Sequence, residues 1–236
     1  MTGAEGSGAK RPPWLQTVRP AAILAGVGAL AEGDAGQRRC PWALSAPEYL
    51  AYHDHEWGRP IGDDRLVLER ICLEGFQSGL SWLTILRKRA AFRRAFLDFD
   101  PGAVAELDEA HIRQLLLDVG IVRHRGKIVA AIENARATVR LQRSHRSLAA
   151  LCWGHEPASA PAPTAGSRPP RTTAEAKALA GELKALGFRY VGPVTIYSLM
   201  QSLGLVNDHL SGCSTRQLAE EERGRFPRPG RGGGIG

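Results

Sequence analysis

The sequence lacks a long apolar run, which excludes a membrane-spanning helix. A helix that crosses a bilayer needs about 20 predominantly apolar residues, and no stretch of this 236-residue chain approaches that length. The longest apolar run near the start, residues 20–30, is short and rich in Ala and Gly, and Glu32 and Asp34 follow it. Because this run also lacks the layout of a secretion signal, we expect a cytoplasmic protein with no membrane partner.

Cysteine is scarce as well. The chain has four cysteines, none of them in a C-x-x-C pair, and they are Cys40, Cys72, Cys152 and Cys213. Seven histidines accompany them, and no secretion signal is recognised. This usage indicates a reducing compartment rather than a disulfide scaffold.

Acidic residues are outnumbered by basic ones, 24 to 31, which gives a formal net charge of +7. Such a balance favours a polyanionic partner. More than half of the excess lies in residues 1–39 and 214–236, because each of these segments carries five basic and three acidic side chains. Tails of this kind are often merely solvated, so charge alone does not establish a nucleic-acid partner.

Strand patterns and internal repeats are also lacking, and helical spacing predicts an all-α domain over residues 40–213. Residues 154–172 are rich in Pro, Ala and Ser and predict a flexible loop. We expect residues 1–39 to be a disordered extension and residues 214–236 to be a disordered basic tail. Helices are expected at about 45–52, 64–90, 90–97, 107–118, 125–142, 173–186 and 193–203, with a further turn starting at Pro101.

Residues 115–128, LLLDVGIVRHRGKI, combine a helix, a tight glycine break and a basic second helix. Glycine permits a turn that other residues resist, and the following helix start offers unpaired N–H groups to an anion. This predicts a helix–hairpin–helix that contacts DNA phosphate, although by spacing alone a helix–turn–helix corner with a solvated basic face fits equally well. The residues expected at the phosphate are Gly120, Arg123, Arg125, Gly126 and Lys127.

Residues 71–82, ICLEGFQSGLSW, place polar and aromatic side chains at helical spacing. If one helix continues through the segment, a single face carries Glu74, Gln77, Ser78, Ser81 and Trp82. A carboxylate, an amide, two hydroxyls and a Trp beside two glycines suit a pocket wall better than a core or a solvated surface.

Three aromatic residues precede this segment: Trp42, Tyr49 and Tyr52. Core packing is the commoner role of such rings. The functional alternative is a cage around a planar base, in which each stacking contact contributes about 1–3 kcal/mol.

Candidate metal ligands stand near the two ends of the predicted domain, and they are Cys40, His53, His209 and Cys213. A Cys2His2 set suits tetrahedral zinc, and four protein ligands would close the site and make it structural. The spacing is not that of a zinc finger, and two buried thiols with two isolated histidines are the simpler alternative. His55 is a competing ligand to His53.

Together these segments resemble the bacterial DNA-3-methyladenine glycosylase I family of the helix–hairpin–helix superfamily. The resemblance covers about residues 40–213 apart from the 154–172 loop. It rests on CPWALSAPEYLAYHDHEWG (40–58), ICLEGFQSGLSW (71–82), GIVRHRGKI (120–128), FRYVGPVTIYSLMQSLGLVNDH (188–209) and GLVNDHLSGC (204–213). It implies a helix–hairpin–helix glycosylase fold whose two ends are clipped together by one structural zinc ion.

The resemblance also implies individual roles. It implies that Glu74 hydrogen-bonds the base, that Trp82 stacks on it, and that Tyr49, Tyr52 and Trp42 line the pocket. It also implies that the zinc ligands are Cys40, His53, His209 and Cys213. We further expect Tyr52 to join Glu74 in catalysis, and Gln77, from the polar face of residues 71–82, to contact the base. The chain departs from the family where Phe76 replaces a polar amide and a single Cys213 replaces a run of cysteines.

The implied reaction is hydrolysis of the N-glycosidic bond of 3-methyladenine, and of 3-methylguanine as a further candidate, in double-stranded DNA after base flipping. Methylation at N3 makes adenine cationic and weakens that bond, so the enzyme needs mainly to select the cation and stabilise the sugar electrostatically. No Asp occurs between Asp118 and Asp208, which disfavours action on normal bases. The only Lys of the hairpin is expected at phosphate, which disfavours a Schiff-base lyase.

We therefore expect a monofunctional, monomeric enzyme that works at the nucleoid. A broader alkylpurine glycosylase is an alternative that a long, deep aromatic cleft would favour. The alternative from another class is a non-catalytic, zinc-containing module that binds damaged DNA.

Overall fold

The computed structural model describes residues 29–32, 36–167 and 170–230. In chain order its helices are η3 (Pro41–Ser45), α1 (Pro47–His55), α2 (Asp64–Gln77), α3 (Trp82–Ala95), η4 (Leu97–Phe99), α4 (Pro101–Ala105), α5 (Glu109–Leu115), α6 (Arg125–Arg143), α7 (Leu148–Trp153), α8 (Ala174–Ala185), α9 (Pro193–Ser202) and α10 (Ser214–Arg225). The described strands are β1 (Ala31–Glu32) and β2 (Arg38–Arg39), which pair antiparallel. The prediction of an all-α domain is confirmed.

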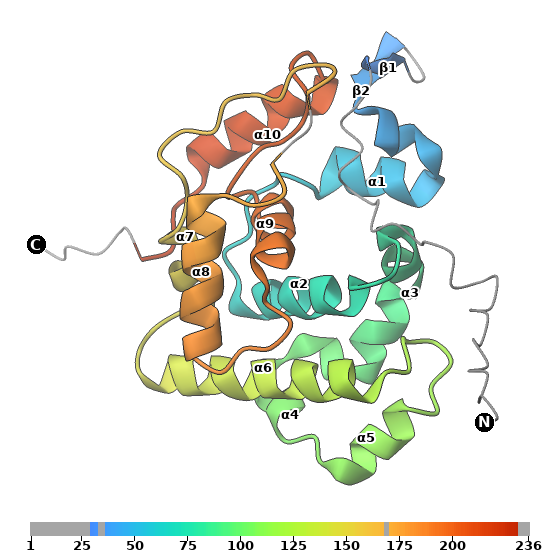
Figure 1. Cartoon of the computed structure of the whole chain (residues 1–236), viewed down its shortest axis with the longest axis vertical. Helices are drawn as coiled ribbons and strands as arrows, with labels where there is room; N and C mark the ends of the chain where they lie inside the picture. Colours follow the sequence, from blue (N-terminus) through green and yellow to red (C-terminus); the bar gives the residue numbers. More distant parts are fainter. Residues whose placement is uncertain (1–28, 33–35, 168–169, 231–236) are drawn as a thin grey trace, which may run out of the picture.

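Helix α2 lies at the centre of the molecule. It packs against α3, α6, α7 and α9, and the long α6 lies along its side with α4 and α5 beyond (Figure 1). Every residue from Val67 to Phe76 is buried. Because this run includes three charged side chains, the core of the fold also carries polar chemistry, which is described below.

The predicted helix over 64–90 is interrupted, and this corrects one expectation. Helix α2 ends at Gln77 and α3 begins at Trp82. Between them Gly79 has φ +82°, a conformation that favours glycine, and the Ser81 side chain accepts a hydrogen bond from Thr84 N as the N-cap of α3. The prediction of one helical face from Glu74 through Trp82 is therefore wrong.

The remaining helices follow the sequence more closely. The expected helices at 107–118, 125–142, 173–186 and 193–203 correspond to α5, α6, α8 and α9 with small differences at their ends. The short α7 was not predicted. In the 154–172 segment, the described residues form no helix or strand, and Pro163 O accepts a hydrogen bond from Ser211 N at 2.8 Å.

The two ends of the domain are more ordered than predicted. Residues 214–225 form α10, so the prediction of a disordered tail is wrong there. Arg216 Nη1 holds the helix by donating to Asn207 O at 2.7 Å and to His209 O at 2.8 Å. The buried residues of α10 are only Thr215 and Ala219. So small an apolar stripe is hard to recognise in a charged sequence.

At the other end, Arg38 N donates to Ser214 Oγ at 3.1 Å, which brings β2 against the start of α10. The prediction of disorder is therefore wrong for the paired strands, residues 31–32 and 38–39. The rest of that prediction falls mainly on residues 1–28 and 33–35, which lie outside the described residues, as do residues 231–236 of the tail. Among the helices that the structure describes, none is long and apolar enough to cross a membrane.

Candidate active site and metal centre

The predicted pocket residues come together from three helices. Tyr52 on α1 meets Trp82 on α3, with ring centroids 5.5 Å apart and an interplanar angle of 55°. Both rings are buried, as is Glu74 on α2. The Tyr49 hydroxyl accepts a hydrogen bond from Leu83 N at 3.1 Å, which fixes α1 against the start of α3.

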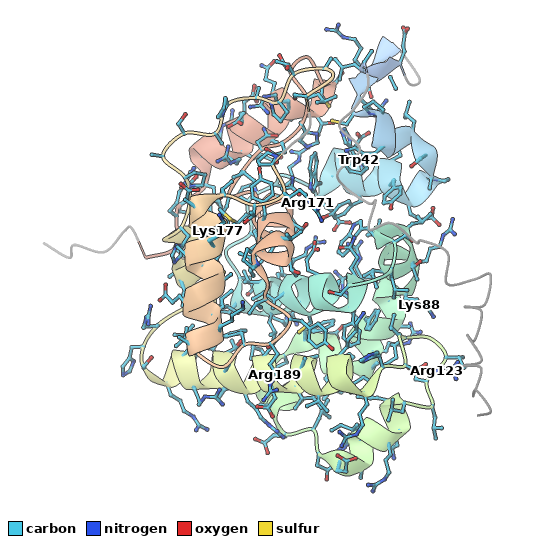
Figure 2. The ribbon with its side chains drawn as sticks, in the orientation of Figure 1. Trp42, Lys88, Arg123, Arg171, Lys177 and Arg189 are labelled. Carbon is cyan, nitrogen blue, oxygen red and sulfur yellow. The ribbon has the colours of Figure 1, made fainter. Side chains whose placement is uncertain are left out.

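Trp42 completes the aromatic group. Figure 2 shows it beside α1, where its ring meets Tyr49 edge-on at 5.7 Å and lies 6.5 Å from Tyr52. Gln77 is the last residue of α2, one turn after Glu74, and is only partly buried. The structure thus gathers the pocket residues through tertiary packing rather than along one helix.

Three of the predicted pocket residues each have a polar atom that is buried without a hydrogen-bond partner in the described part of the chain. These atoms are Glu74 Oε1, the Tyr52 hydroxyl and Trp82 Nε1. Buried polar groups are nearly always hydrogen-bonded. Atoms of this kind on three neighbouring side chains therefore mark a place where a ligand with both donors and acceptors would be bound.

Burial also changes the ionisation of Glu74. Loss of water around the carboxyl raises its pKa to about 8, and the positive charge of Arg70 opposes the shift. A carboxyl in this state gains most from a ligand that is itself cationic, because such a ligand stabilises the carboxylate. The arrangement can therefore distinguish a cationic base from a neutral one.

Phe76, where the resemblance led us to expect a polar amide, is a core residue in the structure. Its ring packs in the core against Phe92 at 4.5 Å and against Phe96 at 5.7 Å. Phe76 thus belongs to the apolar core of the domain.

The predicted hairpin joins α5 to α6. A Cβ on Gly120 would lie 2.9 Å from Ala91 Cβ, so only glycine fits this turn. Lys88 of α3 braces it by donating to Val119 O at 2.9 Å and to Gly120 O at 3.2 Å. Figure 2 shows Lys88 and Arg123 at the same edge of the molecule.

Helix α6 begins after His124, whose ring accepts a hydrogen bond from Lys127 N at 3.3 Å. Arg123 and Arg125 are exposed, and Arg125 pairs with exposed Glu109 at 2.8 Å. Gly126 lies in the first turn, where an added Cβ would be 3.2 Å from the His124 ring. Exposed ion pairs contribute little, so both arginines are available to a phosphate.

The predicted phosphate contact of the Lys127 side chain is wrong. This residue is buried, and its amine donates to Phe76 O at 2.9 Å and to Ser78 O at 2.6 Å. These carbonyls belong to the C-terminal end of α2, where a positive charge is favourable. Lys127 therefore joins α6 to α2.

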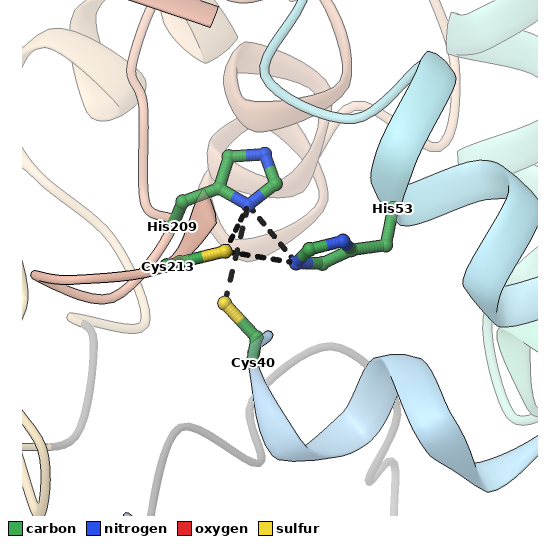
Figure 3. Close-up of side chains that lie close together, drawn as sticks. All are labelled: Cys40, His53, His209 and Cys213. Carbon is green, nitrogen blue, oxygen red and sulfur yellow. Dashed lines mark hydrogen bonds between the residues drawn. The ribbon is translucent and has the colours of Figure 1, made fainter. Parts of the chain in front are cut away.

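The four predicted metal ligands meet in one buried cluster (Figure 3). Cys40 precedes η3, His53 lies in α1, and His209 and Cys213 lie between α9 and α10. Their ligand atoms all lie within 4.8 Å of one another. His55 is exposed and lies outside the cluster, so the structure decides between the two histidines in favour of His53.

The distances within the cluster suit a tetrahedral ion. His209 Nδ1 lies 3.1 Å from His53 Nε2 and 3.7 Å from Cys213 Sγ, which is 3.5 Å from His53 Nε2. Cys40 Sγ lies 3.9 Å from His209 Nδ1. Bonds of about 2.0 Å to nitrogen and 2.3 Å to sulfur would separate tetrahedral ligands by roughly 3.3–3.8 Å. The cluster could therefore hold a metal with little rearrangement.

Neighbouring groups orient the two imidazoles. His53 Nδ1 donates to Asp54 Oδ1 at 2.7 Å, and His209 Nε2 donates to Trp57 O at 3.0 Å. The other ring nitrogen of each histidine is thereby left as the acceptor that faces the cluster, as in metal sites. Asp54 was not among the predicted site residues, although an Asp directly after a candidate ligand was a visible signal in the sequence.

The thiols respond to the same surroundings. The hydrogen bond with Cys40, followed by those with His209 and His53, lowers the pKa of the Cys213 thiol. A thiolate is the form that binds metal. Trp42 lies against this centre too, 5.1 Å from the His53 ring, so it is a wall shared by the cluster and the aromatic pocket.

An all-α domain with a hairpin before α6 and a buried carboxyl among aromatic rings is the architecture of a helix–hairpin–helix DNA glycosylase. Comparison with known proteins agrees with this class. A family model described as methyladenine glycosylase matches residues 42–217. The chain therefore belongs to the methyladenine glycosylase family.

Named relatives support the same placement. The chain is 46% identical to DNA-3-methyladenine glycosylase 1 of Escherichia coli (strain K12), over 74% of this chain and 95% of the relative. It is 40% identical to DNA-3-methyladenine glycosylase of Haemophilus influenzae, over 74% and 96% of the two chains. A solved structure of 3-methyladenine DNA glycosylase I has a TM-score of 0.71 at 46% identity, and covers 75% of this chain and 98% of its own.

One further structure, of the Staphylococcus aureus 3-methyladenine DNA glycosylase I, addresses recognition of 3-methyladenine. It shares 33% identity with this chain at a TM-score of 0.71, and covers 75% of this chain and 96% of its own.

Proposed function

We propose that this protein is a DNA-3-methyladenine glycosylase that hydrolyses the N-glycosidic bond of the flipped, methylated base. The observation that carries the proposal is the group of buried, unpartnered polar atoms on Glu74, Tyr52 and Trp82. A flipped purine brings donors, acceptors and a planar ring to this group. Relatives named as enzymes favour catalysis over a non-catalytic damage-binding module.

The roles of the pocket residues follow from their chemistry. Glu74 accepts hydrogen bonds from the base and stabilises its positive charge. Trp82 stacks on the base, and Tyr52 orients it against Glu74. Tyr49, Trp42 and Gln77 complete the lining. Because the methylated base leaves as a neutral molecule, these residues need not supply a strong acid, and stabilisation of the positively charged sugar is the main task.

DNA is held separately from the base. Arg123 and Arg125, with the backbone at Gly120 and Gly126, contact phosphate without reading sequence. This suits an enzyme that inspects any site in alkylated double-stranded DNA. The enzyme acts as a monomer on DNA of the nucleoid, in the cytoplasm.

The metal of the Cys40, His53, His209 and Cys213 cluster is zinc, one ion per chain. Two thiolates and two imidazoles are a ligand set that zinc prefers, and four protein ligands leave no open position for a reactive water. The ion is therefore structural, and its role is to hold the start and the end of the domain together.

The test of the function is release of free base from methylated duplex DNA by the purified chain, separated by chromatography. We expect free 3-methyladenine, with 3-methylguanine as the further product to be quantified. Tight binding of methylated DNA without any released base would instead identify a binding module. Release of 7-methylguanine at a comparable rate would identify a broader alkylpurine enzyme.

A further inference from the structure

A buried arginine lies beneath the pocket and takes no part in the roles assigned above. Arg70 is 6% exposed on α2, and its Nη2 donates to Glu56 Oε2 at 2.6 Å. Glu56 also accepts from Arg89 Nη1 at 2.5 Å and from Arg89 Nη2 at 2.7 Å. The three side chains thus join the C-terminal end of α1 to α2 and α3 in one network.

The free side of Arg70 faces the pocket residues. Its Cζ lies 5.6 Å from the centre of the Tyr52 ring. Its Nη1 is buried and has no hydrogen-bond partner among the described residues. Glu74 follows Arg70 by four residues on the same helix, so the two side chains emerge on the same face one turn apart.

Other charged groups near α2 are directed elsewhere. Glu69 pairs with Arg93, which is 41% exposed at the surface, and the Lys127 amine of α6 is held by backbone carbonyls. On the α1 side, Glu56 is shared between Arg70 and Arg89, and the Tyr52 pKa is raised chiefly by burial. Arg70 is the positive charge that acts on Glu74.

An arginine side chain is rarely buried in a protein core. Taking its charge out of water is costly, and an apolar side chain of similar volume is often as stable. Arg70 has one nitrogen paired with Glu56 and the other buried without a partner among the described residues, and its guanidinium lies near the Tyr52 ring. A purely structural ion pair would not require this arrangement. Glu69 with Arg93 provides that structural comparison within the same helix.

We propose that Arg70 is a positioning residue of the active site, which fixes the Tyr52 ring and supplies the counter-charge that keeps the Glu74 carboxylate available for a cationic base. The inference rests on the proposed roles of Glu74 and Tyr52. Glu56, shared with Arg89, holds the guanidinium in place. When Glu74 is ionised, its negative charge and that of Glu56 balance the positive charges of Arg70 and Arg89. When Glu74 is protonated, a net positive charge remains beside the pocket and repels the cationic base.

The test is the pH profile of kcat/KM for release of 3-methyladenine from methylated duplex by the full chain. This parameter reports ionisations of the free enzyme. A nearby opposite charge lowers a carboxyl pKa by about 1–3 units, so Arg70→Met should move the acid limb upward by about one pH unit. The variant should lose roughly 10-fold in kcat/KM at pH 7 and regain part of it at pH 9.

Matched variants separate positioning from folding. Arg93→Met removes the comparison ion pair and should leave the limb where it is in the wild type. Arg70→Lys retains the charge and should keep the limb while lowering kcat, because Lys cannot hold both Glu56 and Tyr52. If Arg70→Met does not fold, Arg70→Gln carries the same expectation, since it keeps a donor for Glu56 without the charge.

The inference is wrong if the acid limb of the kcat/KM profile stays at its wild-type pH in Arg70→Met or Arg70→Gln. It is also wrong if that limb moves in Arg70→Lys. Failure of the proposed function looks different: the wild type releases no base, or Glu74→Gln retains the acid limb. In the Glu74→Gln background Arg70→Met should shift nothing.

Discussion

At the scale of single residues, the role proposed for Glu74 sets stability against activity. The Glu74 carboxyl is buried in α2 and has a pKa of about 8, far above that of an exposed glutamate. In the folded state the neutral form is favoured, yet recognition of a cation needs the charged form. Sites that bind ligands commonly keep such strain at a cost in stability.

Glu74→Gln is expected to raise the melting temperature at pH 9 and leave it nearly unchanged at pH 4. The sign follows from linkage. Because the folded pKa lies above the unfolded value, the stability associated with Glu74 is fully present below about pH 4.5 and is lost as the pH rises through about 8. The neutral amide avoids this loss, so a gain of roughly 5 °C or more is expected at pH 9. Thermal denaturation of both proteins across this range is the measurement, and parallel curves would show that the carboxyl is not strained by burial.

Trp82→Ala should weaken binding of free 3-methyladenine while leaving affinity for undamaged duplex close to that of wild type. Stacking contributes about 1–3 kcal/mol per base, and phosphate contacts are made elsewhere. Titration calorimetry with the base and fluorescence anisotropy with DNA measure the two affinities. Because Trp82 is fully buried, the variant must first be shown to be folded; an equal loss of both affinities in folded protein would make Trp82 a core residue only.

Residue types indicated which side chains would lie together better than they indicated which way each one points. Glu74, Tyr52 and Trp82 could be singled out because a carboxylate and aromatic rings are conspicuous among small residues, and all three are buried in the structure; their roles stay predictions. Lys127 was assigned to phosphate because it is basic and near Gly120, whereas its side chain points inward. Its spacing of four and seven residues from buried Ala131 and Asn134 was the signal that it lies on the inner stripe of α6.

At the scale of secondary structure, the hairpin and the first turn of α6 are where we propose that the protein binds DNA. Arg123→Ala combined with Arg125→Ala should weaken binding to any duplex, and each lost phosphate contact should reduce the slope of log affinity against log salt by roughly 0.9. The slope is measured by anisotropy titrations at several salt concentrations. Arg143→Ala, at the far end of α6, is the matched control.

Lys127→Ala is the companion variant, and its outcome should differ. It removes the hydrogen bonds to Phe76 O and Ser78 O, so it should lower thermal stability and leave the salt slope at its wild-type value. A wild-type slope in the double arginine variant would show that Arg123 and Arg125 do not contact phosphate. A reduced slope in Lys127→Ala would show that the Lys127 side chain does.

Element boundaries show what helical spacing alone cannot decide. The pattern continues through residues 78–81, yet the chain turns there, because Gly79 adopts a left-handed conformation and Ser81 caps a new helix. This break places Trp82 on a helix that crosses α2 rather than extends it. The pocket therefore depends on a turn whose signal, a Gly and a Ser within a helical pattern, is common in continuous helices as well.

At the scale of the whole molecule, the Cys2His2 cluster joins segments that are distant in sequence. Cys213→Ser is expected to abolish the stoichiometric binding of one zinc per chain and to lower the melting temperature, while protein that remains folded still releases base. Structural zinc contributes about 10–16 kcal/mol in small peptides, and here a separate core reduces the net effect. Elemental analysis with thermal denaturation measures both quantities.

His55→Ala is the control for the metal prediction. This residue is exposed, so the variant should retain zinc, whereas His53→Ala should lose it. Protein purified without chelators that contains no zinc, or that loses zinc with His55 instead, contradicts the assignment.

The global arrangement was predictable where several motifs agreed in order, which is why the all-α fold and the clustering of Cys40, His53, His209 and Cys213 could both be expected from the sequence. The order beyond residues 40–213 was not predictable. Helix α10 is held mainly by polar contacts, such as those of Arg216 with Asn207 O and His209 O. Contacts of that kind leave no hydrophobic pattern in the sequence from which they could be predicted.

Every cysteine of the chain is buried, including both sulfur atoms of the cluster. Thiolates are the strongest nucleophiles in proteins, and burial is what renders them inert. Electrophilic methylating agents, which create damaged purines, also react with exposed thiolates. Burial of Cys40 and Cys213 therefore keeps these sulfur atoms out of contact with such reagents in solution.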